Sequence, residues 1–118
     1  MFNFEKLEVW QKAIDFADLV YKHTRRFPAD ERFGLTNQMR RAAVSISSNI
    51  VEGTSRMSQS DFRRFIEIAT GSVFEVTSQA FIGRGQGFLR EDSFRALYTS
   101  AEEVGRMLSG LRKSLTSK

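Results

Sequence analysis

Apolar residues recur along this chain at alternating spacings of three and four, the pattern of a helix with one buried face. The pattern forms four blocks, and no strand-like alternation persists for more than a few residues. In the first block the stripe runs from Leu7 through Trp10 and Ile14 to Tyr21, and in the last it runs from Phe94 to Leu115. The blocks predict helices over about residues 5–26, 31–53, 59–86 and 91–114.

Residues between the blocks carry the signals of helix ends. Pro28 stops the first helix, and Asp30 can cap the second. Gly53 is a natural stop for the second helix, Ser58 can cap the third, and the third should end near Gly87. Four amphipathic helices joined by short loops predict an all-α, up-down-up-down antiparallel four-helix bundle. We expect one domain over residues 1–118, because this length supports one core.

The segment RRAAVSISSNIVEG (residues 40–53) gives the second helix small or apolar side chains nearly all round. A helix without a strongly charged face is usually covered on more than one side. Two interpretations remain open: a tight internal helix crossing, or a flank that packs on another subunit. We favour a subunit interface, which would comprise Val44, Ser47, Ser48 and Val51.

Two arginines stand near the middle of the second helix. In an antiparallel bundle, residues equidistant from a turn lie side by side, which puts Arg40 and Arg41 level with Asp18 on the first helix and Glu75 on the third. We therefore expect Asp18, Arg40, Arg41 and Glu75 to form a structural ion-pair network. An arginine that lost its carboxylate in such a place would cost a few kcal/mol.

Positive charge is in excess and gathers toward both ends of the predicted bundle. The chain has a formal net charge of +4, and 13 of its 18 basic residues are arginine, which forms ordered contacts with phosphate. The candidate nucleic-acid-binding residues are Arg25, Arg26, Arg56, Arg63, Arg64, Arg112 and Lys113. Arg63 and Arg64 are the foremost candidates. They lie near the start of a helix, where the helix dipole does not favour positive charge, so the dipole does not explain their presence. The alternative is that the basic surface is incidental.

Enzyme chemistry has little support in the sequence. There is no cysteine and one histidine, His23, and no metalloprotease, P-loop or nucleophile-elbow motif occurs. GRGQG (residues 83–87) follows a helix rather than a strand, and no Lys-Ser/Thr pair comes after it. We expect no catalytic residues, no metal and no cofactor. No signal-peptide pattern and no apolar run of membrane-spanning length occur, so a cytoplasmic protein is expected.

The segments LEVWQKAIDFADLVYKHTRRFP and GLTNQMRRAAVSISSNIVEGTSRMSQSDFRRFIEIATGSVFEV carry a resemblance over nearly the whole chain. They resemble the bacterial four-helix-bundle proteins first noticed as open reading frames in intervening sequences of 23S ribosomal RNA genes. Arg40 to Gly53, Trp10 with Lys12 and Ala13, and Gly71-Ser72 with Glu75 carry the resemblance most specifically. The chain departs from the family after Glu75, where VTSQAFIGRGQGF is polar and glycine-rich.

This resemblance implies a four-helix bundle that assembles as a ring, typically a homopentamer. A similar protein, the accessory variability determinant of diversity-generating retroelements, is a basic pentamer that works with a reverse transcriptase and nucleic acid. Two hypotheses follow. The first is a non-enzymatic accessory factor that binds RNA or DNA electrostatically as an oligomer. The second is a structural or protein-interaction module without a nucleic-acid role.

Overall fold

The computed structural model describes residues 1–115, and these contain helices and no strands. The elements are the 3-10 helix η1 (Asn3–Lys6), α1 (Glu8–Thr24), the 3-10 helix η2 (Ala29–Glu31), α2 (Leu35–Thr54), α3 (Gln59–Gly85) and α4 (Glu91–Ser114). The predicted all-α class is confirmed.

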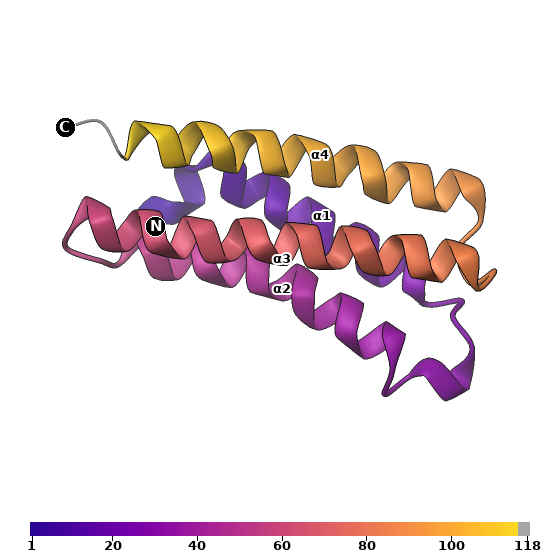
Figure 1. Ribbon diagram of the computed structural model, residues 1–118. Helices are drawn as coiled ribbons and strands as arrows, with labels where there is room; N and C mark the ends of the chain where they lie inside the picture. The colour runs from indigo at the N-terminus through magenta and orange to yellow at the C-terminus, as the bar shows by residue number, and fades with distance from the viewer. Residues whose placement is uncertain (116–118) are drawn as a thin grey trace.

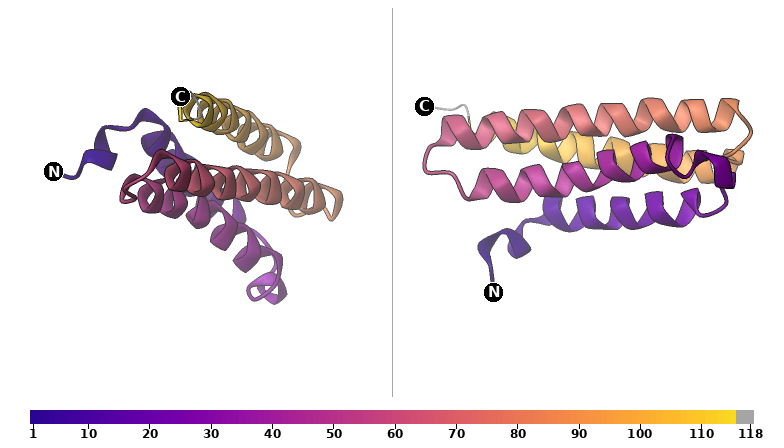
Figure 2. Two further views of the ribbon diagram at one scale, coloured as in Figure 1. Left: turned by 60° about the vertical axis from the view of Figure 1, so that its left-hand side comes forward. Right: turned by 90° about the horizontal axis from the view of Figure 1, so that it is seen from below.

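Each long helix runs opposite in direction to the one before it (Figure 1). The packed pairs are α1–α2, α2–α3, α3–α4 and α4–α1, and the described chain measures 47 × 22 × 21 Å. Toward its N-terminal end α2 diverges from α3, so the connection from α1 to α2 stands off the body of the bundle (Figure 2).

The core follows the three-four spacing of the apolar residues. The largest side chains with almost no solvent contact are Phe16, Met39, Ile46, Ile50, Ile66 and Leu108. Each such side chain contributes about 1.5–3 kcal/mol when it leaves water. Burial along one stripe of each helix therefore holds the bundle together and leaves the other faces open for contacts.

The starts of the first two long helices differ from the prediction. Leu7 is extended, so α1 begins at Glu8 rather than near residue 5. The second helix begins at Leu35, where the Glu31 side chain accepts a hydrogen bond from the Leu35 backbone N–H at 2.9 Å. Glu31, rather than Asp30, therefore supplies the cap. A Cβ on Gly34 would lie 2.8 Å from the Glu31 carboxylate, so a larger residue there would require the capping side chain to move.

The ends of α3 agree with the prediction. Ser58 accepts a hydrogen bond from the Asp61 N–H at 3.0 Å. After Gly85 the chain turns at Gly87, whose φ of 81° suits glycine, and the Phe88 N–H returns to the Gly83 carbonyl at 2.8 Å. The predicted bounds of the last helix, 91–114, match α4.

Gly53 does not stop α2, contrary to our expectation. It is buried inside the helix, which continues to Thr54. A Cβ added there would lie 2.7 Å from the Phe62 ring and 3.2 Å from the Phe65 Cβ, so glycine at this place lets α3 approach α2 closely.

Candidate functional surfaces

A hollow rich in basic groups lies at the end of the bundle where α1 ends and α4 begins. Its volume is about 410 Å³, and its charged and titratable lining residues are Lys22, His23, Arg25, Arg26, Arg90 and Asp92. We call it the basic cleft. Arg25 and Arg26 follow the last residue of α1, and the turn after α3 brings Phe88 into the lining of the same cleft.

The floor of the basic cleft is ordered by aromatic packing. The rings of Phe27 and Phe88 lie 5.5 Å apart, and Leu89 is buried between the helix ends. A Cβ on Gly83 would lie 3.3 Å from both Leu89 and Phe27, so this end of the bundle is tightly filled. The basic side chains of the cleft therefore lie next to well-packed apolar residues.

Most of the positive charge in the basic cleft has no carboxylate beside it. Arg90 lies 3.8 Å from Asp92, an exposed and weak contact. Within residues 1–115 no ion pair involves Lys22, Arg25 or Arg26, and all three are exposed. The cleft thus presents three uncompensated cations on a concave surface, an arrangement that attracts an anion.

His23 is the residue of this cleft whose ordinary pKa lies nearest to pH 7. Partial burial lowers its pKa below the ordinary value of 6.5, the positive charge of Lys22 lowers it further, and Asp92 acts in the opposite direction. His23 is therefore neutral at pH 7 and gains a positive charge only in more acidic solution.

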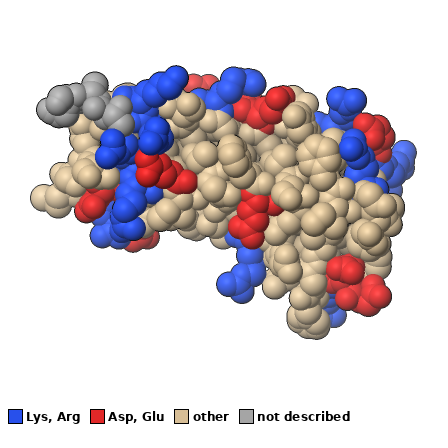
Figure 3. Space-filling view, viewed as in Figure 1, with Lys and Arg blue, Asp and Glu red and all other residues tan. Residues whose placement is uncertain are grey.

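The predicted basic residues at the opposite end are partly neutralised. Arg56 lies 3.2 Å from Glu52, and Arg112 lies 2.7 Å from Glu67. Arg63 is half-buried, and the exposed Arg64 has its guanidinium carbon 5.2 Å from the Phe65 ring centre. Lys113 is exposed near the end of α4. Figure 3 shows basic residues toward both ends, with acidic residues among them and mostly uncharged residues in the middle.

Arg40 turns toward α1 rather than toward a carboxylate. Its Nε donates to the Thr24 hydroxyl at 2.9 Å, its guanidinium donates to the Tyr21 carbonyl at 3.4 Å, and its guanidinium carbon lies 4.6 Å from the Tyr21 ring centre. The last carbonyls of a helix have no partner within it, so the end of α1 offers ready acceptors to this arginine.

The predicted ion-pair network is accordingly wrong for the single chain. Within the described part of the chain, no ion pair joins Arg40 or Arg41 to Asp18 or Glu75. Arg41 and Asp18 are exposed, and Glu75 accepts a hydrogen bond from Gln79 at 3.4 Å. Pairing residues that are equidistant from a turn did not predict the partners of Arg40, because a long arginine side chain can reach a full helical turn away.

The predicted interface on α2 is only partly on the surface. Val44 and Ser48 are exposed and Val51 is half-buried, but Ser47 is only 8% exposed and donates to the Val44 carbonyl at 3.1 Å. Ser47 therefore faces the interior of its own chain.

On another side of α2, the Ser45 and Ser72 hydroxyls hydrogen-bond at 2.9 Å. Ser45 is half-buried and Ser72 is buried. Part of the small-residue surface therefore serves an internal crossing with α3, the other interpretation that the sequence left open.

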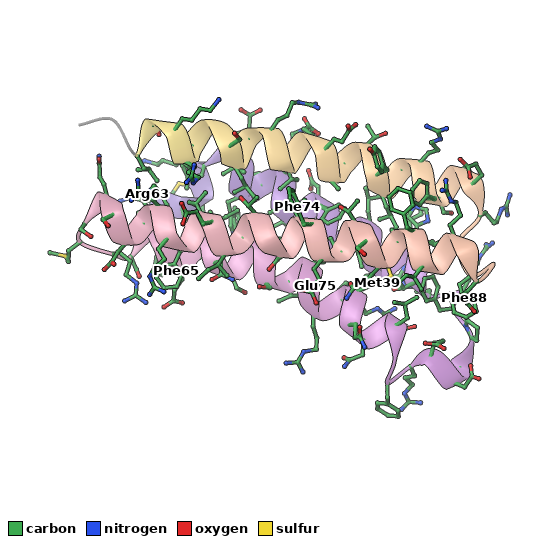
Figure 4. The ribbon with its side chains drawn as sticks, viewed as in Figure 1. Met39, Arg63, Phe65, Phe74, Glu75 and Phe88 are labelled. Atoms are coloured by element: carbon green, nitrogen blue, oxygen red, sulfur yellow. The ribbon has the colours of Figure 1, made fainter. Side chains whose placement is uncertain are left out.

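Exposed large apolar side chains recur along α3, where no site was predicted. Ile68, Phe74, Phe81 and Ile82 are all exposed there, and Phe74 is 71% exposed. Phe74 and Phe81 line a groove of about 580 Å³ between α3 and α4. In Figure 4 Phe74 lies on the α4 side of α3 and Glu75 on the α2 side. The signal was present in the sequence, since these four residues fall off the core stripe of their helix.

Two kinds of feature are absent from the described residues. No helix among them is both long and apolar enough to cross a membrane. No group of three or more histidine, cysteine, aspartate or glutamate side chains in residues 1–115 is arranged to hold a metal ion.

One comparison with known proteins supports the fold and another shows the family. A crystal structure of a protein of unknown function from the S23 ribosomal protein family of Bacteroides thetaiotaomicron superposes with a TM-score of 0.80 at 21% identity. It covers 89% of this chain and 98% of its own. No curated protein matches the chain significantly. The family model described as 23S rRNA-intervening sequence protein matches residues 5–110, and the chain therefore belongs to this family.

Proposed function

We propose that this protein is a non-enzymatic, oligomeric accessory factor that binds the sugar-phosphate backbone of RNA or DNA through the basic cleft. The observation that carries the proposal is the concave grouping of Lys22, Arg25 and Arg26 without carboxylate partners. Arginine forks suit phosphate oxygens, and a concave arrangement lets several cations contact one stretch of backbone.

Such binding is weak for one copy and strong only for several. A single chain carries a formal net charge of +4, and three cations in a cleft make few phosphate contacts. An oligomer presents the same cleft repeatedly, which raises avidity without any new kind of contact. The role of assembly in this proposal is to multiply the phosphate contacts along one nucleic acid.

Sequence preference should be slight. Cations that contact phosphates position a nucleic acid but do not distinguish bases, and base edges are read by groups that enter a groove. The cleft lies where helices end and holds mainly charged side chains above an apolar floor. We expect affinity to depend on salt far more than on sequence.

A second function, a protein-interaction module, has one observation in its favour. The exposed apolar side chains of α3 form a surface suited to another protein. The partner in that case would be a further copy of the chain, a reverse transcriptase or another protein. This second function replaces the first only if the protein binds no nucleic acid, since one chain can carry both surfaces.

The test is a fluorescence-anisotropy titration with single- and double-stranded RNA and DNA at low and physiological salt. We expect binding that weakens as salt rises, with a log-log slope of about −0.7 to −0.9 per phosphate contacted. Arg25→Ala/Arg26→Ala should weaken binding to all four ligands and make the slope shallower. The matched control is Arg56→Ala/Arg112→Ala, which removes the same charge from arginines that already pair with glutamates.

Three results would count against the proposal. If none of the four ligands binds at low salt, the second function, a protein-interaction module, is favoured. Affinity indifferent to salt would refute the electrostatic mechanism. If Arg63→Ala/Arg64→Ala weakens binding and Arg25→Ala/Arg26→Ala does not, the binding surface is the opposite end, as the sequence first suggested.

A further inference from the structure

Two further hollows adjoin the basic cleft. The second hollow, of about 340 Å³, lies where the chain passes from α1 to α2, and its basic lining residues are Arg25, Arg32 and Arg40. It shares Arg25 with the basic cleft. The third hollow, of about 510 Å³, lies on the face formed by α1 and α2, shares Arg40 with the second, and is also lined by Arg41. The three hollows therefore form one continuous surface, which we call the basic track.

The basic track contains little negative charge. No aspartate or glutamate of residues 1–115 lines the second or third hollow, and of the described acidic residues only Asp92 lines the basic cleft. Within the same part of the chain, no ion pair involves Arg32, Arg40 or Arg41. Glu31 precedes Arg32 in the sequence, but it lines no part of the track and its carboxylate caps α2. The track is thus an extended surface for a polyanion.

Arg40 joins the second and third hollows in a fixed orientation. Its Nε donates to the Thr24 hydroxyl at 2.9 Å, its guanidinium donates to the Tyr21 carbonyl, and the guanidinium carbon lies 4.6 Å from the Tyr21 ring centre. All of these partners are uncharged, so the positive charge of Arg40 is not neutralised. A side chain that is already ordered loses less entropy when a ligand binds.

The basic track curves around the C-terminal end of α1. The basic cleft is built from the end of α1 and the start of α4, whereas the third hollow lies on the side of α1 that faces α2. A helix with its side chains is only about 10–12 Å across. Duplex DNA is far too stiff to follow such a curve, since its persistence length is about 50 nm. A duplex can therefore contact one part of the track, whereas a single strand can follow all of it.

Aromatic side chains accompany the cations along the track. Tyr21 lines the third hollow, and Phe88 lines the basic cleft just after the end of α3 (Figure 4). Phe33 directly follows Arg32 and is 85% exposed, and its ring centre lies 5.2 Å from the Arg32 guanidinium carbon. An exposed ring beside an arginine offers a face on which an unpaired base can stack. The bases of a duplex are already stacked on one another and cannot use it.

We propose that the basic track binds a single strand of RNA or DNA, with its phosphates on the arginines and an unpaired base stacked on Phe33. The strand runs from the basic cleft past Arg32 to Arg41. Along α2 alone the track extends from Thr36 to Ser45, about 14 Å at 1.5 Å per residue. This inference rests on the proposed function and adds to it that the preferred nucleic acid is unpaired.

The first test compares one oligonucleotide of about 16 nucleotides, without self-complementary segments, alone and paired with its complement. It is made both as RNA and as DNA, and binding is followed by fluorescence anisotropy at low salt. We expect the natural chain to bind the single strand at least about fivefold more tightly than the duplex, the factor that one stacked base contributes. Equal affinity, or tighter binding of the duplex, would overturn the inference.

A second test removes two cations of the track that lie outside the basic cleft. Arg32→Ala/Arg41→Ala should weaken single-strand binding and reduce its log-log salt slope by about 1.4, since each lost phosphate contact removes about 0.7. Duplex binding should change little. The matched control is Arg64→Ala/Arg106→Ala, which removes two exposed arginines that form no ion pair within residues 1–115 and line no part of the track.

A third test addresses stacking. Phe33→Leu keeps an apolar side chain but removes the ring, so it should weaken single-strand binding about fivefold and leave the salt slope and the duplex affinity unchanged. Phe2→Leu is the control, because Phe2 is also highly exposed and lies at the opposite end of the bundle (Figure 1). Circular dichroism verifies that each variant keeps its helices.

The outcomes separate this inference from the proposed function. If Arg25→Ala/Arg26→Ala weakens binding while neither Arg32→Ala/Arg41→Ala nor Phe33→Leu has an effect, the basic cleft binds alone and the inference is wrong, but the proposed function stands. A track variant that weakens single-strand and duplex binding equally, or no more than its control, also overturns the inference. If no ligand binds at low salt, both are wrong.

Discussion

The guanidinium of Arg40 lies over the ring of Tyr21, with its carbon 4.6 Å from the ring centre and its Nε donating to the Thr24 hydroxyl. A side chain of α2 thereby donates hydrogen bonds to the last turn of α1, where backbone carbonyls lack partners within the helix. This contact lies where α2 diverges from α3, so α1 is the neighbour that holds this part of α2 in place (Figures 1 and 2).

Arg40→Ala should therefore lower the free energy of unfolding by about 1–2 kcal/mol, since a cation–π contact and a hydrogen bond are lost together. Arg41→Ala, which removes the same charge from an exposed neighbour, should change it by less than about 0.5 kcal/mol. Both free energies of unfolding are measured by urea denaturation at one and the same protein concentration. Equal losses in the two variants would contradict the assigned contact.

Two glycines in helices should respond in opposite directions to alanine. Gly53→Ala should destabilise the fold by about 1–3 kcal/mol, because its Cβ would lie 2.7 Å from the Phe62 ring. Gly110→Ala should stabilise it by about 0.5–1 kcal/mol, because nothing lies within 4 Å and alanine favours the helix. Thermal melting of both variants checks this, and a stabilising Gly53→Ala would disprove the close approach.

The hydroxyl of Ser58 caps α3. Ser58→Ala should cost about 1 kcal/mol, and Ser58→Asp should retain most of the stability, because aspartate also accepts from the first turn. Denaturant midpoints of the three proteins provide the measurement. If aspartate performs no better than alanine, the side chain is not acting as a cap.

His23 should make the fold sensitive to mild acid. Its pKa in the folded chain lies below 6.5, chiefly because of burial, so the unfolded chain binds the proton more readily. The stability that neutral His23 provides is complete above pH 6.5 and is lost as pH falls through the lower folded pKa. His23→Gln should remove this part of the pH dependence, as measured by melting temperature between pH 7.5 and 5.

Nucleic-acid binding should change with pH in the opposite sense. A protonated His23 adds a cation to the basic cleft, so affinity should rise as pH falls below 6.5. Anisotropy titrations at constant salt should show this rise for the natural chain and a smaller one for His23→Gln. A rise of equal size in both would assign the effect to another group.

Helix positions could be predicted from this sequence because they depend on local spacing. The stripe from Phe94 to Leu115 and the cap at Ser58 are properties of neighbouring residues, and α3 and α4 formed close to their expected bounds. Glu31 was missed as a cap because its reach to Leu35 depends on the unusual backbone of Gly34.

Long side chains and leftover residues were harder to predict. Arg40 had several possible partners at its level, and only the packed structure selects Thr24 and Tyr21. Phe74 and Phe81 were not assigned to any surface, because the stripe of α3 was complete without them. Apolar residues left over after a core stripe has been assigned are thus candidates for interfaces.

The close approach of α2 to α3 at Gly53 also bears on how the chain folds. The two helices are joined by the short connection over residues 55–58, so their pairing closes a small loop and costs little entropy. The contact between α1 and α4, by contrast, joins distant parts of the chain, as the ion pair of Lys12 with Glu103 shows. We expect the terminal helices to dock last. Substitutions between α2 and α3 should therefore slow folding, whereas those between α1 and α4 should mainly speed unfolding.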